Sequence, residues 1–221
     1  AETDSLAEAE AYYRSAADLA REIGYHRAQA AAMHGLAAGV YLPRGQFDLA
    51  LAADEEVRGI ISRQGQYNWL VGPLAQGFAL FGLGLVNTYL GRYDEAEAAL
   101  ADSLELRRQI DDQRGIGYCR YGLGLLALSR REHSQAVDDF RQAYEIHSQL
   151  GLKAEMVVDL SYLGQAYLEL GELEQAAGTS DQSMALLAEQ KDVEEVQQVY
   201  FNHFRVLAAR QEPEAGRSLQ D

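Results

Sequence analysis

Apolar residues recur along this chain at the spacing of an amphipathic helix. In the segment 80–90 they lie three or four positions apart, at Leu80, Leu83, Val86 and Leu90, which predicts a helix with one apolar face. Gly91 follows, and a residue that adopts positive φ at little cost is typical of a helix end. A second apolar series, which begins at Ala96, predicts another helix after the turn. Residues 73–110 are therefore expected to form an antiparallel helical hairpin.

The hairpin pattern returns at a fixed interval. Leu-Gly pairs begin at Leu83, Leu123 and Leu163, so the step between successive pairs is constant. A constant period of roughly 40 residues is the signature of a repeat architecture. Gly84 and Ala96 are small where the two helices of one unit should cross, which lets their backbones approach closely. Since one hairpin cannot bury its apolar faces alone, each is expected to stack on a neighbour.

The pattern predicts a single all-α domain over residues 1–221, with about ten helices. Residues 1–24 are expected to form an N-terminal cap or half repeat, 192–210 a C-terminal cap helix, and 211–221 a tail without regular structure. Four hairpins are expected between them, at 26–64, 73–110, 113–150 and 153–190. The first hairpin is one residue out of phase near Pro43.

The first hairpin is separated from the next by an irregular segment. The turn glycines Gly45 and Gly91 lie farther apart than one regular step. The excess falls in residues 65–73, which include the single tryptophan, Trp69. Interrupting loops often carry function, but an aromatic ring also fills gaps between packed elements. We favour the packing role for Trp69.

The repeated residues resemble the tetratricopeptide repeat, whose pattern is a Leu-Gly pair, an aromatic residue, a turn glycine, a second aromatic residue and a small alanine. The unit that fits most closely has Leu163, Gly164, Tyr167, Gly171, Leu173 and Ala176. The period is longer than the commonest one of about 34 residues, and the usual terminal proline is missing. This longer form is similar to the repeats of bacterial STAND-type regulators and of polarity scaffolds. The resemblance implies a right-handed α-solenoid of stacked antiparallel hairpins.

Charge and composition narrow the functional classes. The formal net charge is −15, which argues against binding nucleic acid, because phosphate contacts need a basic face. The single cysteine, Cys119, forms no internal disulfide and suits a reducing cytosol. The N-terminus lacks a signal-peptide pattern, and no apolar run reaches the length of a membrane span. We expect a cytoplasmic protein without membrane contact, and a fragment of a larger signalling protein.

The motifs of the chain do not support catalysis. The Gly-Leu-Gly segments at 82–84 and 122–124 recur at the repeat period, so close helix packing explains them better than a dinucleotide fingerprint does. Lys153 and Lys191, the two lysines of the chain, do not follow the glycines of a Walker A motif. The histidines form no zinc-binding motif, one cysteine cannot build a structural zinc site, and no nucleophile elbow is present. We expect no enzyme activity, no metal and no cofactor.

The resemblance also implies which side chains face a partner. In the family, the first helices of successive hairpins line a concave groove. The corresponding positions are aromatic in the early hairpins and polar in the later ones. They are Phe78, Phe81, Leu85, Tyr118, Tyr121, Leu125, Ser161, Gln165, Phe201 and Arg205. A groove of this kind suits an amphipathic peptide or helix, while the alternative of equal weight is that some of these rings pack between hairpins.

The sequence therefore predicts a non-catalytic scaffold that binds a protein or peptide, with self-association as another class of partner. The alternative is the small-ligand or effector-sensing domain of a STAND-type ATPase regulator. One internal contact is also expected. Arg120 and Asp159 lie at neighbouring positions of successive first helices, and we expect an ion pair there, because either charge buried alone would be costly.

Overall fold

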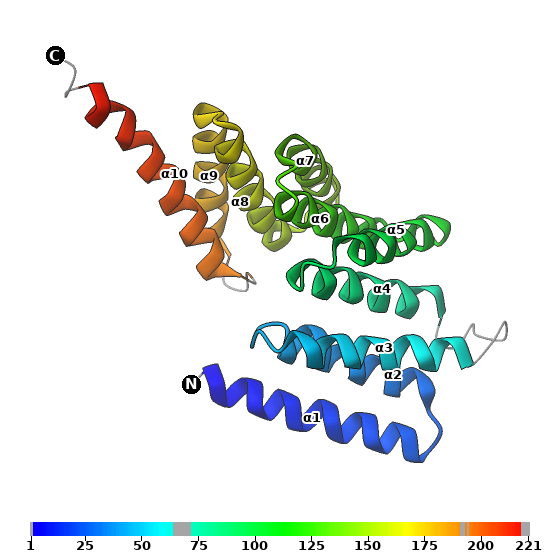
Figure 1. Cartoon of the computed structure of the whole chain (residues 1–221). Coiled ribbons are helices and arrows are strands. Elements are labelled where there is room, and N and C mark those ends of the chain that lie inside the picture. The colour runs from blue at the N-terminus through cyan, green and yellow to red at the C-terminus, as the bar shows by residue number, and fades with distance from the viewer. Residues whose placement is uncertain (1, 64–71, 191–192, 194, 218–221) are drawn as a thin grey trace. The chain divides into compact units, whose positions relative to one another are not determined.

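The computed structural model describes residues 2–63, 72–190, 193 and 195–217 (Figure 1). Within these residues the chain forms ten α-helices and one π-helical segment, and no strand. None of the described helices combines the length and the apolar character that crossing a membrane requires. The chain divides into two compact units, Ala1–Gly122 and Leu123–Asp221. The expected single domain over 1–221 therefore stays a prediction, and the units are described separately.

Unit 1 is a series of helices that pack in chain order. They are α1 (Glu2–Glu22), α2 (His26–Leu36), η1 (Ala37–Tyr41), α3 (Phe47–Arg63), α4 (Gly72–Tyr89), α5 (Tyr93–Gln109) and α6 (Gln113–Ser129), which crosses the unit boundary. Contacts join α1 to α2, α2 to α3, α3 to α4 and α4 to α5, and Figure 1 shows α1 on one side of the α2–α3 pair and α4 on the other. The expected hairpins 26–64 and 73–110 are thus the pairs α2–α3 and α4–α5.

Unit 2 continues the pattern after the boundary in α6. Its helices are α7 (His133–Gln149), α8 (Lys153–Leu170), α9 (Leu173–Leu187) and α10 (Val196–Arg217). Helix α8 contacts α7 and α9, and α10 lies against both α8 and α9. Helix α10 runs through Arg217, beyond the end expected at residue 210. Pro213 therefore lies within the helix and does not end it.

The close crossing expected between the two helices of a hairpin is present at Gly84 and Gly124. A Cβ atom added at Gly84 would lie 2.5 Å from Cγ of Leu100, and one at Gly124 would lie 2.7 Å from Cε1 of Phe140. Both partners are fully buried. A large side chain of the second helix therefore fills the space that the glycine of the first helix leaves open.

The phase shift near Pro43 has a structural cause. Residues Ala37–Tyr41 form a π-helix, in which the backbone N–H of Leu42 donates to the carbonyl of Ala37 at 3.0 Å. One π-turn holds one residue more than an α-turn, so the extra residue is absorbed before the turn. As a result, Gly35 occupies in α2 the place that Gly82 has in α4.

Two expectations concern the segment before α4. Trp69 and most of the interruption at 65–73 lie outside the described residues, so their role stays a prediction. Helix α4 begins at Gly72 with Pro73 in its first turn. This position suits proline, because the fixed φ of its ring matches the helix and its missing N–H has no helical partner there.

The helices end at residues in the left-handed backbone region, and these residues recur at half the repeat period. They are Gly91, Asp111, Arg131, Gly151 and Gly171, with φ between 56° and 78°. At the end of α8, Gly171 and Glu172 donate their N–H groups to Leu168 and Tyr167 at 3.0 and 2.9 Å, which satisfies carbonyls of the last turn. For a residue other than glycine this conformation costs about 1–2 kcal/mol.

We expect Arg131→Gly to raise the free energy of unfolding of unit 2 by about 1 kcal/mol, because the substitution relieves the left-handed conformation. Gly171→Ala should lower it by a similar amount. No atom lies within 4 Å of a Cβ added at Gly171, so backbone strain alone would act. Urea unfolding followed by circular dichroism measures both.

Gly178 is the matched control, because it lies inside α9 with open space around an added Cβ and without a positive φ. Gly178→Ala should stabilise by about 0.5–1 kcal/mol through reduced chain entropy. If Gly171→Ala and Gly178→Ala shifted stability in the same direction, the left-handed turn would not govern the helix end.

Candidate partner-binding surfaces

The predicted site residues of unit 1 gather on α4 and α6. The rings of Phe81 and Tyr118 lie with their centroids 6.1 Å apart and their planes at 46°. Phe81 and Leu85 also border Gly122, where an added Cβ would lie 3.1 and 3.5 Å from their side chains. These residues therefore bridge successive first helices, and all but Gly122 are half-buried.

Phe78 extends this aromatic cluster toward α2. Its ring lies 5.7 Å from the ring of His34, and the guanidinium of Arg107 lies 4.6 Å from its centroid. Phe78 is 38% exposed. Because of the π-helix, His34 occupies in α2 the position that Phe81 has in α4, so His34 belongs to the same series although the sequence pattern did not indicate it. Tyr121 is buried, with 7% exposure.

The predicted residues of unit 2 divide into buried and exposed members. Leu125 is buried, and the hydroxyl oxygen of buried Ser161 accepts a hydrogen bond from the Asn202 amide at 3.0 Å. Gln198 donates in turn to the Oδ1 atom of Asn202 at 2.8 Å. This polar chain ties α8 to α10. Within the described residues, the buried Oε1 atom of Gln165 has no hydrogen-bond partner.

The exposed members of unit 2 lie on α10. Phe201 is 55% exposed. Arg205 pairs with Glu169 at 2.6 Å, and about a third of each side chain is exposed. The structure thus brings Phe78, Phe81, Leu85 and Tyr118 together in unit 1, and it sets Phe201 and Arg205 on α10. A groove common to both units stays a prediction.

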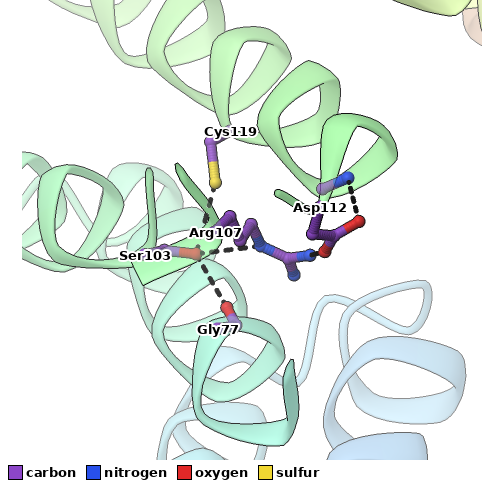
Figure 2. A network of polar contacts seen from close by, with 6 residues as sticks. Gly77, Ser103, Arg107, Asp112 and Cys119 are labelled. Carbon is purple, nitrogen blue, oxygen red and sulfur yellow. Dashed lines mark hydrogen bonds and ion pairs between the residues drawn. The ribbon is translucent and has the colours of Figure 1, made fainter. Parts of the chain in front are cut away.

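A buried polar network lies behind the aromatic cluster, and Figure 2 shows its members pointing toward one another. Arg107, which is 1% exposed, donates from Nε to the Ser103 hydroxyl and pairs with the carboxylate of Asp112. Ser103 donates to the carbonyl of Gly77 at 2.8 Å, and Cys119 donates its S–H to Ser103 at 3.2 Å. The network joins α4, α5 and α6.

Two glycines and a helix cap make room for the buried arginine. A Cβ added at Gly115 would lie 1.8 Å from Nη1 of Arg107, and one at Gly77 would lie 3.2 Å from its Nε. Asp112 precedes α6 and accepts a hydrogen bond from the N–H of Gly115 at 3.0 Å, as helix-capping residues do. Burial raises the pKa of the Cys119 thiol, which makes this cysteine a poor nucleophile.

The buried place that Arg107 and Cys119 occupy holds polar residues again one repeat later. His147 and Asp159 are the counterparts of Arg107 and Cys119 in the next repeat. They lie 2.7 Å apart and are 1% exposed. Burial raises the pKa of Asp159 to about 6, although the hydrogen bond from His147 opposes this shift.

The structure thus gives Asp159 a partner that the sequence did not predict. An ion pair between Asp159 and Arg120, which lies in the other unit, stays a prediction. One repeat further along the chain, the corresponding residues are Leu187 and Val199, which pack in one apolar cluster. The same buried place is therefore polar in two repeats and apolar in the third.

Another buried pair lies next to the aromatic cluster. Asp54 is fully buried, and its Oδ1 atom lies 3.1 Å from Nδ1 of His34. Burial raises the pKa of Asp54, against the effect of His34. Its Oδ2 atom faces Gly82, where a Cβ would lie 2.4 Å away, and has no hydrogen-bond partner in the described part of the chain.

A hollow of unit 1 lies away from the predicted site residues. It has a volume of about 450 Å³ and is lined by α3, α4 and α5, with Arg58, Asp102 and Glu105 among its charged residues. None of the predicted site residues lines it. Among the described residues, no three histidine, cysteine or carboxylate side chains are grouped so that they could hold a metal ion.

Known proteins share this fold. Residues 77–149 match the family model of the tetratricopeptide repeat, which confirms the resemblance over these residues. The crystal structure of BtubC (BKLC) from P. vanneervenii has a TM-score of 0.66 and 20% sequence identity, over 85% of this chain and 75% of that one. The apo form of RapI has a TM-score of 0.64 and 14% identity, over 90% of this chain.

The chain spans 55% of the length of RapI. No curated protein matches the chain in sequence. At these identities the structural likeness establishes the fold alone, which is that of all-helical tetratricopeptide-like hairpins.

We expect Asp112→Ser to lower the free energy of unfolding of unit 1 by about 3 kcal/mol, because Arg107 then stays buried without its carboxylate partner. Serine retains a side chain that can cap α6, so the effect isolates the charge. Adding Arg107→Leu, the residue type found at Leu187, should recover most of the loss. Urea unfolding of both variants measures the effect, and a double variant less stable than Asp112→Ser would contradict it.

The pKa of Asp159 predicts a pH dependence. Because the folded state raises this pKa from 3.8 to about 6, the folded chain holds the proton more tightly than the unfolded chain. The resulting stabilisation is complete below pH 3.8 and is lost as the pH rises through about 6. Relative to the wild type, Asp159→Asn should therefore gain up to about 3 kcal/mol between pH 4 and pH 7.

Urea unfolding of unit 2 across this pH range tests the expectation. Asp138→Asn is the matched control, since the Asp138 side chain is 61% exposed and its pair with Arg141 is screened by solvent. A parallel pH profile for Asp159→Asn and the wild type would rule out Asp159 as the source of the dependence.

Proposed function

We propose that this chain is a non-catalytic scaffold that binds a protein or peptide through the faces of its first helices. The observation that carries the proposal is the half-buried aromatic cluster of Phe78, Phe81 and Tyr118, which continues to His34. Tetratricopeptide repeats suggest protein interaction, and the match over residues 77–149 includes this cluster except for His34. A cytoplasmic location and a role in signalling belong to the same proposal.

The physical case rests on preorganisation. Aromatic side chains supply much of the binding energy of protein interfaces, because they bury a large area while few torsions become ordered. Phe78 already lies between Arg107 and His34, and Arg107 is fixed by Ser103 and Asp112. A partner would therefore meet rings that are largely ordered before binding, which lowers the entropic cost of association.

Charge indicates the kind of partner. The net charge of −15 favours encounter with a positively charged segment. Within unit 2, Glu169 lies beside Arg205 at the predicted surface, so charged positions flank the apolar ones there. We infer that the partner is an amphipathic helix or extended peptide, with apolar anchors for the rings and basic residues at the rim.

The effector-sensing role in a STAND-type regulator is the second candidate. The hollow between α3, α4 and α5, with Arg58, Asp102 and Glu105 in its lining, is the observation that favours it, because both signs of charge would suit a small polar ligand. Stabilisation of the chain by a metabolite, abolished by Asp102→Ala and kept in Phe81→Ala, would favour this candidate over the scaffold.

Peptides selected against the intact chain from a random library provide a direct test of the scaffold. Phe81→Ala should weaken their binding at least about tenfold, which corresponds to about 1.4 kcal/mol, because the ring is a central anchor. Arg205→Glu should alter binding of peptides that also contact unit 2. Fluorescence anisotropy with the selected, labelled peptides measures the dissociation constants.

Leu49→Ala is the matched control, since Leu49 is a large apolar residue of α3 with 47% exposure outside the predicted set. It should leave the affinities unchanged. If the selected peptides were insensitive to Phe81→Ala while Leu49→Ala weakened them, the surface assignment would be wrong. Circular dichroism of each variant shows whether it retains its helices.

A further inference from the structure

The first and the last helix of the chain each expose large apolar side chains. On α10, Tyr200 is 53%, Phe204 66% and Leu207 39% exposed. On α1, Tyr12 is 72% and Leu19 58% exposed. A repeat that caps a stack is expected to have a polar outer face, whereas both helices expose these large apolar side chains.

The exposed side of α10 corresponds to a side that is covered in the preceding hairpin. Phe204 is the counterpart of Gly164 one repeat later. A Cβ added at Gly164 would lie 3.1 Å from Thr179 Oγ1 and 3.3 Å from the Ala176 carbonyl of α9, so α9 packs on this side of α8. Helix α10 has the character of a first helix, and the side that a second helix would cover is exposed.

The exposed side of α1 is complementary. The turn residue Gly24 after α1 corresponds to Gly151 after α7, since both have positive φ before a first helix. In this alignment Tyr12 takes the position of Thr179, and Ala9 that of Ala176. These are the positions with which α9 contacts its own first helix. Helix α1 therefore has the character of a second helix. On the side meant for a first helix Tyr12 is exposed, while Ala9 is half-buried and packs against the core cluster of α2, η1 and α3.

We propose that copies of this chain associate head to tail, with α10 of one copy packed antiparallel against α1 of the next. The contact completes a helical hairpin of the same kind as α8–α9. It joins two different surfaces, so it is heterologous and leaves one α1 and one α10 exposed in every open assembly.

The side chains fit in this register. When Phe204 is placed opposite Tyr12, the antiparallel run sets Tyr200 near Ala16 and Leu207 near Ala9, so large residues meet small ones at both flanks. Phe204 stands where Gly84, Gly124 and Gly164 stand in three hairpins, so the two helices would lie farther apart than α8 and α9. The pair of rings at the centre fills that gap, as aromatic pairs do in protein cores.

The charges of the two helices differ in sign as well. Over Val196–Arg217, α10 carries three arginines and two glutamates, while the chain has a net charge of −15. Arg205 already pairs with Glu169, so Arg210 is the arginine that a partner would meet. Helix α1 carries six acidic and two basic residues between Glu2 and Glu22. The antiparallel register brings Arg210 to the N-terminal part of α1, where exposed Glu8 lies. Attraction of this kind steers association and selects the α1–α10 pairing over two α1 helices.

Complementary variants test the proposal. Tyr12→Asp disables α1 and leaves α10 intact, while Phe204→Asp does the reverse. Sedimentation velocity should show concentration-dependent association of the wild type and monomers for each variant alone. An equimolar mixture of the two variants should give a complex that stops at one copy of each. Leu150→Asp, at an exposed turn residue with 45% exposure, should associate as the wild type does.

The outcomes separate the alternatives. Association of Tyr12→Asp alone would show an α10–α10 dimer, and association of Phe204→Asp alone an α1–α1 dimer, so either would overturn the proposal. A monomeric wild type at all concentrations would overturn it too, and would leave these faces to other segments or partners. Circular dichroism of both variants controls for loss of fold, and recovery of association in the mixture shows that both remain folded.

Discussion

The structure depends on one contact, the close crossing of a small residue of the first helix with the second helix in the hairpins that begin with α4, α6 and α8. Gly84 receives Leu100, and Gly124 receives Phe140. This crossing sets the separation and the rotation of the two helices. Since the turns on either side recur at a regular interval, every other position acquires a fixed environment. A residue and its counterpart one repeat later therefore occupy equivalent places in their own hairpins. We call each series of such counterparts a column.

The columns explain how polar groups are accommodated in the core. At one buried place the hairpins carry Arg107 with Cys119, then His147 with Asp159, then Leu187 with Val199. In each pair both members are polar or both are apolar. A buried polar group that lacks a hydrogen-bond partner destabilises the fold, so a pair of one polar and one apolar residue would be unfavourable. Asp112 completes the first pair from the cap of α6. Polar pairs at one place and apolar ones at another make the hairpins non-equivalent, which favours one order of packing over its alternatives.

The sequence predicted the helical hairpins because periodicity and turn glycines are local signals. It showed a one-residue shift near Pro43, but the π-helix at Ala37–Tyr41 that absorbs the shift depends on packing of α2 against its neighbours, which no local pattern contains. The buried pairs were missed for a different reason. The repeat pattern relates Asp159 to residues of other first helices, whereas its partner His147 lies on a second helix. Exposure was also hard to foresee: Tyr121 and Ser161 are buried where the family geometry implied a surface, because neighbouring helices cover them.

The repeat also determines which exposed apolar side chains remain for association with a partner. Among the described residues of the interior helices, neighbouring helices cover most apolar side chains, and the exposed rings there include Phe78 and Tyr89. At α1 and α10 the described structure provides no further helix to cover the exposed side. Phe204 stands where Gly164 stands one repeat earlier, and Tyr12 corresponds to Thr179 of α9. Exposed apolar groups of this size are costly in water. The same repetition that closes the interior therefore concentrates the tendency to associate on the first and last helices.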